Sequence, residues 1–229
     1  MPLSCPTYPI SLVLAGHRCL VVGGGHVALR KVEGLLAAGA RVTVVAPRVV
    51  EPIGALDVDL ELRPYEAGEA ARYRVVVAAT GRPEIDRAVF ADGERAGVLV
   101  NAADDIPGCA FILPAVVRRG PVSVAVSTAG TSPALASWLR DRVAGLVGPD
   151  VELLATMLGR AREALRASGL PSESLPWREL LDGALPGLVA AGRLDEAESV
   201  LSSWVARLGP TRQTGHPRPA CQEHPPAGG

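Results

Sequence analysis

The chain has 229 residues, of which 48% are hydrophobic and 21% charged, and its formal net charge is −1. This length and composition suffice for a sizeable core, in one large domain or two small ones. The near-neutral charge gives no reason to expect a nucleic-acid or membrane partner. The four scattered cysteines form no C-x-x-C pair or disulfide framework, and no apolar run reaches membrane-spanning length. A reducing cytoplasm is therefore the simplest expected location.

The first predicted strand, Cys19–Val22, ends in a glycine turn that leads into an expected helix. Gly23, Gly25 and Ala28 spell the pattern G-x-G-x-x-A. The first glycine permits a sharp turn, the second lets backbone N–H groups approach a pyrophosphate, and the third small residue lets the helix pack closely. The helix N-terminus adds unpaired donors and partial positive charge. The pattern predicts a dinucleotide site, although similar glycine turns join many strands to helices without one.

The second predicted strand, Arg41–Val45, completes a βαβ unit of roughly the length that this fingerprint requires. An acidic residue usually follows such a strand and binds the ribose hydroxyls, but this chain has Ala46-Pro47-Arg48 there. Three interpretations remain open. Backbone groups hold the ribose, Arg48 meets the 2′-phosphate of NADP, or Arg48 simply begins a solvated loop.

Strands and helices continue to alternate up to residue 113. The further predicted strands are Asp59–Leu62, Arg74–Ala79 and Val98–Asn101, and a helix is predicted from Pro83 to about Ala96. This order predicts an α/β fold with a Rossmann-like, doubly wound parallel sheet. Ligands in such sheets lie beyond the carboxyl ends of the strands. The glycine turn, Thr80 and Asn101–Asp104 are therefore expected at one edge of the sheet.

The pattern changes after residue 113. We predict strands at Phe111–Leu113 and Val122–Ser127, paired as a hairpin, then a helix capped by Ser132 and started by Pro133. Further helices are predicted at about 150–168, 176–190 and 194–208. The expected domains are 1–113, a nucleotide-binding Rossmann-like domain; 114–149, a small α+β region of hairpin and helix; 150–209, a C-terminal helical domain; and 210–229, a disordered tail.

Two segments carry side chains suited to chemistry. Asp104 and Asp105 follow a predicted strand, where a carboxylate beside a cofactor would serve as a general base. The same segment continues as Asp105-Ile106-Pro107-Gly108, which also suits a plain solvated turn. Thr128–Ser132 offers hydroxyl groups and a helix N-terminus, which suit either an anionic substrate or ordinary helix capping.

Five motifs occur together and in a fixed order. They are V-V-G-G-G-x-V-A-x-R-K (Val21–Lys31), A-A-T (Ala78–Thr80), N-x-x-D (Asn101–Asp104), F-I-x-P-A (Phe111–Ala115) and V-S-x-A-G-T-S-P (Val126–Pro133). Over residues 15–150 the chain resembles the N-terminal module of siroheme synthases, the precorrin-2 dehydrogenase family. Members of this family often also act as sirohydrochlorin ferrochelatases.

The resemblance implies NAD-dependent oxidation of precorrin-2 to sirohydrochlorin in siroheme biosynthesis, followed in many members by insertion of Fe²⁺. It implies a homodimer, with 114–149 as the dimerisation region, and it favours NAD because the family commonly lacks the strand-end acid. The catalytic residue is then Asp104, and no resident metal site is expected. The predicted cofactor-binding residues are Gly23, Gly24, Gly25, His26, Val27, Pro47, Arg48 and Thr80. The predicted substrate-binding residues are Asn101, Thr128, Gly130, Thr131 and Ser132.

The chain departs from the family pattern after Asp104. The proline that usually stands two residues after the key aspartate is displaced by Ile106 to Pro107, so Asp105 competes for the catalytic role. Three alternative functions remain at this stage: a dehydrogenase of another small acid, a non-catalytic module that binds tetrapyrrole or nucleotide, and an enzyme with chelatase activity alone.

Overall fold

The computed structural model describes residues 6–102 and 109–208, apart from the side chain of residue 174. The chain divides into two compact units. One comprises Met1–Val116 and Ala125–Arg142, and the other comprises Val117–Val124 and Val143–Gly229. The domain boundaries predicted from the sequence stay a prediction, and the expected tail at 210–229 lies outside the described residues.

The first unit is built on a five-stranded parallel sheet with the strand order β3-β2-β1-β4-β5. The strands are β1 (Arg18–Val22), β2 (Arg41–Val45), β3 (Asp59–Glu61), β4 (Val75–Ala78) and β5 (Leu99–Ala102). This order is that of a Rossmann-like sheet, in which the chain reverses direction of winding next to β1. The predicted α/β fold class is therefore confirmed.

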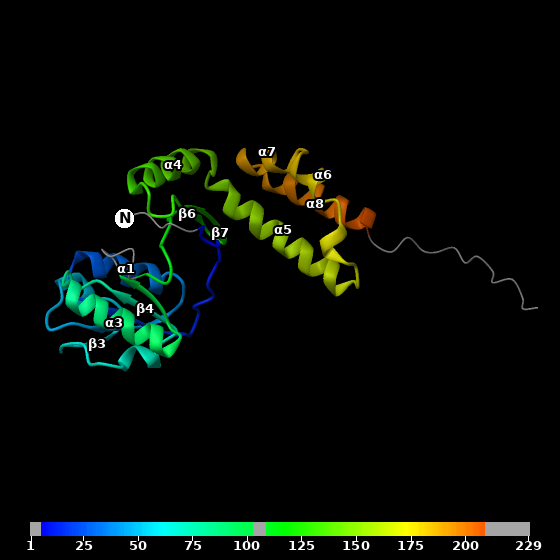
Figure 1. Ribbon diagram of the computed structural model, residues 1–229. Helices are drawn as coiled ribbons and strands as arrows, with labels where there is room; N and C mark the ends of the chain where they lie inside the picture. The colour runs from blue at the N-terminus through cyan, green and yellow to red at the C-terminus, as the bar shows by residue number, and fades with distance from the viewer. Residues whose placement is uncertain (1–5, 103–108, 209–229) are drawn as a thin grey trace, which may run out of the picture. The chain divides into compact units, whose positions relative to one another are not determined.

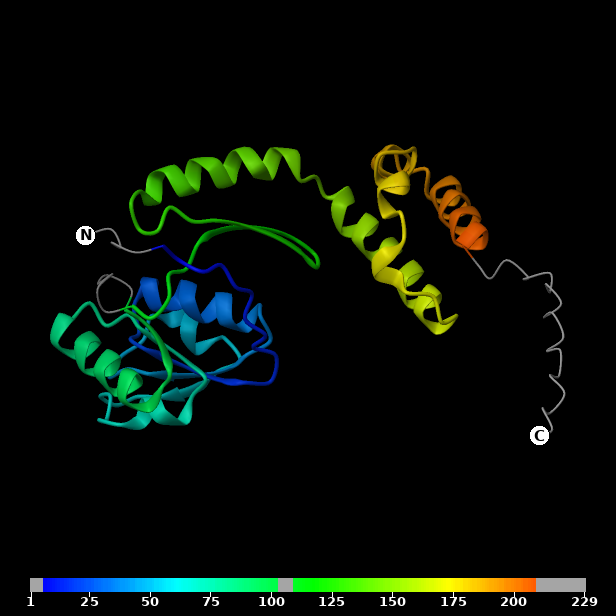
Figure 2. The same cartoon turned by 45° about the vertical axis from the view of Figure 1, so that its right-hand side comes forward.

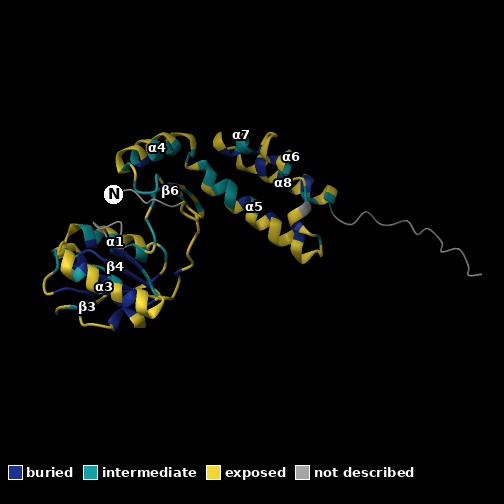
Figure 3. Cartoon of the chain, in the orientation of Figure 1, coloured by how far each residue is buried: buried dark blue, intermediate teal, exposed yellow. Residues whose placement is uncertain are grey.

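Both faces of the sheet are covered, which explains its continuous apolar strands. One face packs against α1 (His26–Leu36) and α2 (Glu51–Gly54) through residues such as Cys19 and Val21. The other face packs against α3 (Pro83–Ala96) and the short helix η1 (Glu69–Arg72). Figure 1 shows α1 and α3 beside the sheet, and Figure 3 shows buried strands under helices whose outer sides are exposed.

Helix α3 lies unusually close to the neighbouring strand β5. Gly93, in the middle of the helix, is buried, and a Cβ added there would approach Val100 Cγ2 closer than any real Cβ does. Gly97 ends the helix in a left-handed conformation with φ +67°. The absence of a side chain at Gly93 therefore fixes the distance between helix and sheet.

The hairpin predicted after the sheet is real, but its first strand was placed wrongly. It consists of β6 (Ala115–Arg119) and β7 (Val122–Val126), which Figure 2 shows as a two-stranded ribbon. The residues predicted as a strand, Phe111–Leu113, are irregular. The carbonyl of Phe111 accepts a hydrogen bond from the Asn101 side chain, and its ring packs on the core of the first unit. Phe111 thus belongs to the preceding sheet, and the hairpin begins only after it.

The remaining helices are α4 (Pro133–Leu146), α5 (Asp150–Ala167), α6 (Trp177–Leu181), α7 (Leu185–Ala190) and α8 (Leu194–Leu208), with a short helix η3 at Ser172–Ser174. The four helices α5, α6, α7 and α8 pack around a separate core that includes Met157, Leu165 and Trp204. The single helix predicted at 176–190 is wrong, because two helices occupy it. Pro186 has no N–H to donate to the carbonyl of Asp182, so one continuous helix is disfavoured. None of the described helices is both long and apolar enough to cross a bilayer.

The close approach of α3 to the sheet can be tested by one methyl group. We expect Gly93→Ala to destabilise the protein by about 1–3 kcal/mol, because Val100 or the helix must move. Gly34→Ala is the matched control, since Gly34 also lies inside a helix but has open space at its Cβ position. Alanine there should stabilise by about 0.5–1 kcal/mol. Urea unfolding measures both, and equal effects of the two substitutions would contradict the packing described.

Candidate functional site

A crevice of about 860 Å³ opens at the carboxyl ends of β1, β2 and β4. It lies within the first unit, where the sheet topology places ligand sites. Three groups of residues line it: the glycine turn, the end of β2, and the inner side of α3 with the segment after β3. The predicted cofactor residues that line it are Gly23, Gly24, Gly25, Pro47, Arg48 and Thr80.

The glycine turn brings three strand ends into direct backbone contact. A Cβ on Gly23 would overlap the carbonyl of Ala79 at the end of β4, and Gly23 has a φ of +130°. A Cβ on Gly24 would overlap the carbonyl of Arg48 beyond β2. The Gly24 carbonyl in turn accepts a hydrogen bond of 2.8 Å from the N–H of Val50. No side chain fits at either position, so glycine is required at both for the strand ends to come into contact.

Gly25 has a different environment, which suits a ligand. It is the N-cap of α1, it has an ordinary extended φ of −88°, and no atom lies within 4 Å of its Cβ position. The helix start receives no hydrogen bond from a capping side chain among the described residues, and its first turn contains no acid. The first N–H groups of α1 therefore remain available beside open space. This arrangement fits a pyrophosphate, because those donors and the helix dipole both favour a bound anion.

The end of β2 contributes backbone to the crevice. The contact of Arg48 with the glycine turn is made by its carbonyl, while Pro47 and Arg48 are both exposed residues of the lining. The other two predicted cofactor residues, His26 and Val27, lie in the first turn of α1 and do not line the crevice. Their side-chain roles stay predictions, although their backbone N–H groups belong to the open helix start.

A buried acid that the sequence did not single out holds the end of β4. Asp86, on α3, is 5% exposed. Its Oδ1 accepts hydrogen bonds from the Thr80 N–H (3.2 Å) and from the Thr80 Oγ1 hydroxyl (2.7 Å). In the sequence Asp86 is an ordinary polar residue in the first turns of a helix, so only its burial reveals its contact.

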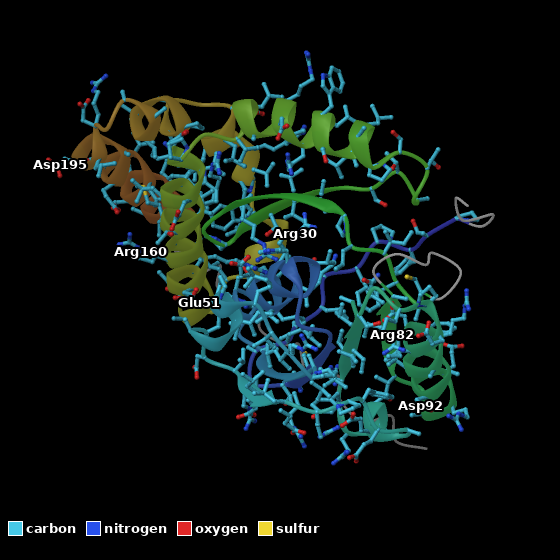
Figure 4. The ribbon with its side chains drawn as sticks, turned by 90° about the vertical axis from the view of Figure 1, so that its left-hand side faces the viewer. Arg30, Glu51, Arg82, Asp92, Arg160 and Asp195 are labelled. Atoms are coloured by element: carbon cyan, nitrogen blue, oxygen red, sulfur yellow. The ribbon has the colours of Figure 1, made fainter. Side chains whose placement is uncertain are left out.

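The far wall of the crevice was also missed by the sequence analysis. Asp92 of α3 accepts hydrogen bonds from the Tyr65 hydroxyl (2.8 Å) and the Gly68 N–H (2.6 Å), and it pairs with Arg95. The backbone N–H of Gly68 contributes most to lowering the pKa of the Asp92 carboxyl. Burial raises the pKa of the Tyr65 hydroxyl, and the hydrogen bond to Asp92 adds to this. Figure 4 labels Arg82, which precedes the first residue of α3, and Asp92, which lies within that helix.

A third buried acid supports the segment that carries Tyr65. Glu69 Oε2 accepts a hydrogen bond of 2.7 Å from Arg63, and Oε1 accepts one of 2.8 Å from the Glu66 N–H. Burial alone would raise the pKa of the Glu69 carboxyl, but these donors outweigh it and lower the pKa. The loop between β3 and β4 is thus fixed to itself and to α3, which gives the crevice a firm wall.

The predicted catalytic residue Asp104 lies outside the described residues, as does Asp105. The residues on either side of this segment are held together. The Asn101 side-chain amide donates to the Phe111 carbonyl at 2.9 Å, and the Cys109 thiol donates to the Ala102 carbonyl at 3.1 Å. Asn101 and Cys109 also form an antiparallel bridge. The amide of Asn101, predicted to bind substrate, therefore joins the described residues on the two sides of 103–108, and its substrate contact stays a prediction.

The predicted substrate residues after β7 form a tight turn before α4. The Thr128 hydroxyl accepts the Ser132 N–H at 3.1 Å, and the Ser132 hydroxyl accepts the Leu135 N–H at 3.2 Å, so the predicted helix cap is confirmed. Ala129 has a φ of +49°, which is uncommon for a residue with a Cβ. Both hydroxyl oxygens therefore accept capping hydrogen bonds. None of 128–132 is among the described residues that line the crevice, and their substrate contacts stay predictions.

The described residues contain no preformed cluster of metal-binding side chains. No group of three or more His, Cys, Asp or Glu side chains there is arranged to hold a metal ion. Cys19 is fully buried in β1 and is a core residue, as its place in an apolar strand predicts.

Comparisons with known proteins show that the residues lining the crevice lie in a segment that matches a known protein family. Residues 10–115 match the family described as putative NAD(P)-binding, and residues 119–146 match the family described as sirohaem biosynthesis protein central. The first match contains the glycine turn and all five strands of the sheet. The predictions of a nucleotide cofactor and of the family resemblance are thereby confirmed.

Whole-chain relatives agree with these matches. The siroheme synthase of Acinetobacter baylyi is 35% identical over 213 residues, which cover 88% of this chain and 47% of that protein. The siroheme synthase of Nitrosomonas europaea is 37% identical over 204 residues, which cover 85% and 42%. The chain thus spans less than half the length of these relatives. The solved structure of SirC, precorrin-2 dehydrogenase, has a TM-score of 0.66 and 23% identity, and the likeness covers 88% of this chain and all of that one.

Because Gly24 and Gly25 have different environments, replacing each with alanine should affect stability and NAD⁺ binding in opposite ways. Gly25→Ala should leave the unfolding temperature nearly unchanged, because its Cβ enters open space. It should weaken NAD⁺ binding about tenfold or more, because that space is where a pyrophosphate would approach α1. Gly24→Ala should lower the unfolding temperature by several degrees, because its Cβ meets the Arg48 backbone. Calorimetry measures both effects, and normal NAD⁺ binding by Gly25→Ala would contradict the assigned site.

Proposed function

Because residues 10–115 and 119–146 match the putative NAD(P)-binding and sirohaem biosynthesis families, and the chain is 35–37% identical to siroheme synthases, we propose that it belongs to the precorrin-2 dehydrogenase family and oxidises precorrin-2 to sirohydrochlorin with NAD⁺. The observation that carries this proposal is the open start of α1 at the edge of the parallel sheet. It offers an anion site at the point where a dinucleotide crosses such a sheet. The second matched segment includes β7 and α4, which follow the sheet.

The residues that line the crevice do not by themselves select NAD⁺ over NADP⁺, because no acid follows β2 and Arg48 is exposed there. The dinucleotide would lie with its pyrophosphate on the first turn of α1 and its ribose beside Pro47 and Arg48. No acid follows β2, so the backbone there would hold the ribose hydroxyls. Arg48 is exposed and would tolerate a 2′-phosphate. NAD⁺ is the proposed cofactor because the family resemblance favours it.

The proposed reaction removes one hydride and one proton from the macrocycle. Bound NAD⁺ supplies the chemistry of hydride acceptance. This chain supplies the base, for which we propose the carboxylate of Asp104. The hydrogen bonds of Asn101, Ala102 and Cys109 support this role, because they hold Ala102, two positions before Asp104, at the end of β5 and next to β4. The proton would pass to a carboxyl oxygen of Asp104.

Further parts of the proposal concern iron and assembly. Insertion of Fe²⁺ into sirohydrochlorin as a second substrate would require removal of two pyrrole protons, for which the same carboxylate would serve. A homodimer is supported by the apolar exposure of α4, where Leu135 is 47%, Trp138 54% and Leu146 84% exposed. Thr128, Gly130, Thr131 and Ser132, just before α4, would then bind substrate carboxylates. A cytoplasmic location also remains part of the proposal.

A spectroscopic assay of precorrin-2 with NAD⁺ tests the function, with Fe²⁺ added afterwards. We expect NADH and sirohydrochlorin in equal amounts, and siroheme after the addition of Fe²⁺. Asp104→Ala should lower turnover by about 10²- to 10⁴-fold while leaving NAD⁺ affinity nearly intact. Asp105→Ala is the matched control and should keep turnover within about threefold.

The outcomes separate the proposal from its alternatives. NAD⁺ binding without turnover of precorrin-2 would indicate a non-catalytic module or a dehydrogenase of another acid. Metal insertion into sirohydrochlorin without any NAD⁺ reduction would indicate a chelatase alone. Loss of turnover in Asp105→Ala with full activity in Asp104→Ala would transfer the base to the neighbouring residue.

A further inference from the structure

Thr80 lies at the end of β4, beside both the crevice and the glycine turn. Its backbone nitrogen is 3.1 Å from the Cβ position of Gly23, so its placement is coupled directly to the turn at the end of β1. The residue is half-buried and lines the crevice. Any dinucleotide that approaches the open start of α1 at this sheet edge therefore passes near Thr80.

Asp86 holds both hydrogen-bonding groups of Thr80 with a single oxygen. Oδ1 accepts the backbone N–H at 3.2 Å and the hydroxyl at 2.7 Å. Asp86 is 5% exposed, whereas Glu84 on the same helix turn has a side chain that is 62% exposed and pairs with Arg82. The Asp86 carboxyl thus serves an internal contact and is hardly accessible to solvent.

The Thr80 hydroxyl carries one proton, and the geometry decides where it goes. Two acceptors are within reach: Asp86 Oδ1 at 2.7 Å and the Arg82 carbonyl at 3.2 Å. The bond to the carboxyl is shorter and charge-assisted, so it takes the proton. The hydroxyl oxygen also accepts the Arg82 N–H at 3.0 Å. One lone pair of Oγ1 remains for a ligand, and no proton remains.

We propose that Asp86 is a positioning residue that makes the Thr80 hydroxyl an acceptor only, so that Thr80 binds a hydrogen-bond donor of the nucleotide. Such donors are the ribose hydroxyls and the carboxamide N–H₂ group of nicotinamide. The pyrophosphate of a dinucleotide is esterified at both ends and has no proton to donate at neutral pH, and the Thr80 hydroxyl has none to offer it. The N–H groups of α1 would bind the pyrophosphate, and Thr80 would accept a hydrogen bond from an uncharged part of the same ligand. This inference rests on the proposed binding of NAD⁺.

The test is isothermal titration with NAD⁺ and, separately, inorganic pyrophosphate, on the full chain. Thr80→Val should weaken NAD⁺ binding about fivefold to tenfold, because the hydrogen bond that Thr80 accepts from the nucleotide is lost. Pyrophosphate binding should stay unchanged, because pyrophosphate makes no such bond. Thr80→Ser should bind NAD⁺ within about threefold of the wild type. Circular dichroism checks that each variant is folded.

Variants of Asp86 test whether it acts through Thr80. Asp86→Asn keeps an acceptor oxygen at the position that both bonds use, so it should stay within about threefold of the wild type. Asp86→Leu should weaken NAD⁺ binding about as much as Thr80→Val. The double variant Thr80→Val/Asp86→Leu should bind no more weakly than Thr80→Val alone, because residues that act in series are not additive. A merely structural role for Asp86 would instead give additive losses.

Each contrary result has a separate meaning. Wild-type protein that does not bind NAD⁺ contradicts the proposed function. Wild-type protein that binds NAD⁺, with Asp86→Leu binding equally well, contradicts only the positioning role. Pyrophosphate binding that weakens in Thr80→Val overturns the assignment of Thr80 to a donor group. If Asp86→Leu does not fold, Asp86→Asn decides, since a loss as large as that of Thr80→Val overturns the acceptor role.

Discussion

The backbone contact between the ends of β1, β2 and β4 is the constraint on which the rest of the site depends. Gly23 touches the end of β4 and Gly24 touches the segment after β2, at distances that exclude any side chain. This contact brings the start of α1 to the edge of the sheet without a capping side chain or an acid in its first turn. An anion site results from local geometry, because the first N–H groups of a helix have no intrahelical acceptor, and here no capping side chain accepts their hydrogen bonds either.

The walls of the crevice are held by buried acids, none of which has to contact the ligand. Asp86 fixes the end of β4, Asp92 fixes Tyr65 and Gly68 to α3, and Glu69 fixes Arg63. Each carboxyl accepts at least two hydrogen bonds, which offsets the cost of burial. Gly93 then sets the distance between α3 and β5. Rigid walls of this kind favour a preformed site, in which little ordering free energy is lost on binding.

The sequence predicts the sheet well, because apolar strands buried on both faces leave a strong and continuous signal. The strand at Arg41–Val45 and the helix at Pro83–Ala96 are found with the observed boundaries, and the strand at Arg74–Ala79 is one residue too long at each end. It misplaces the first hairpin strand at Phe111–Leu113, where Phe111 alone packs against the earlier core and a single contact carries no period. Asp86 and Asp92 are also missed, because the sequence does not distinguish an aspartate that accepts buried hydrogen bonds from one that is exposed on a helix.

The central claim is that the bare first turn of α1 receives the pyrophosphate of NAD⁺. Titration of ¹⁵N-labelled protein with NAD⁺, followed through the backbone amides by NMR, tests it most directly. The account predicts that the largest shifts occur at the amides of Gly25, His26 and Val27, with smaller ones near Arg48 and Thr80. Saturable NAD⁺ binding that leaves these amides unmoved, or that shifts only amides of α5 to α8, would contradict it.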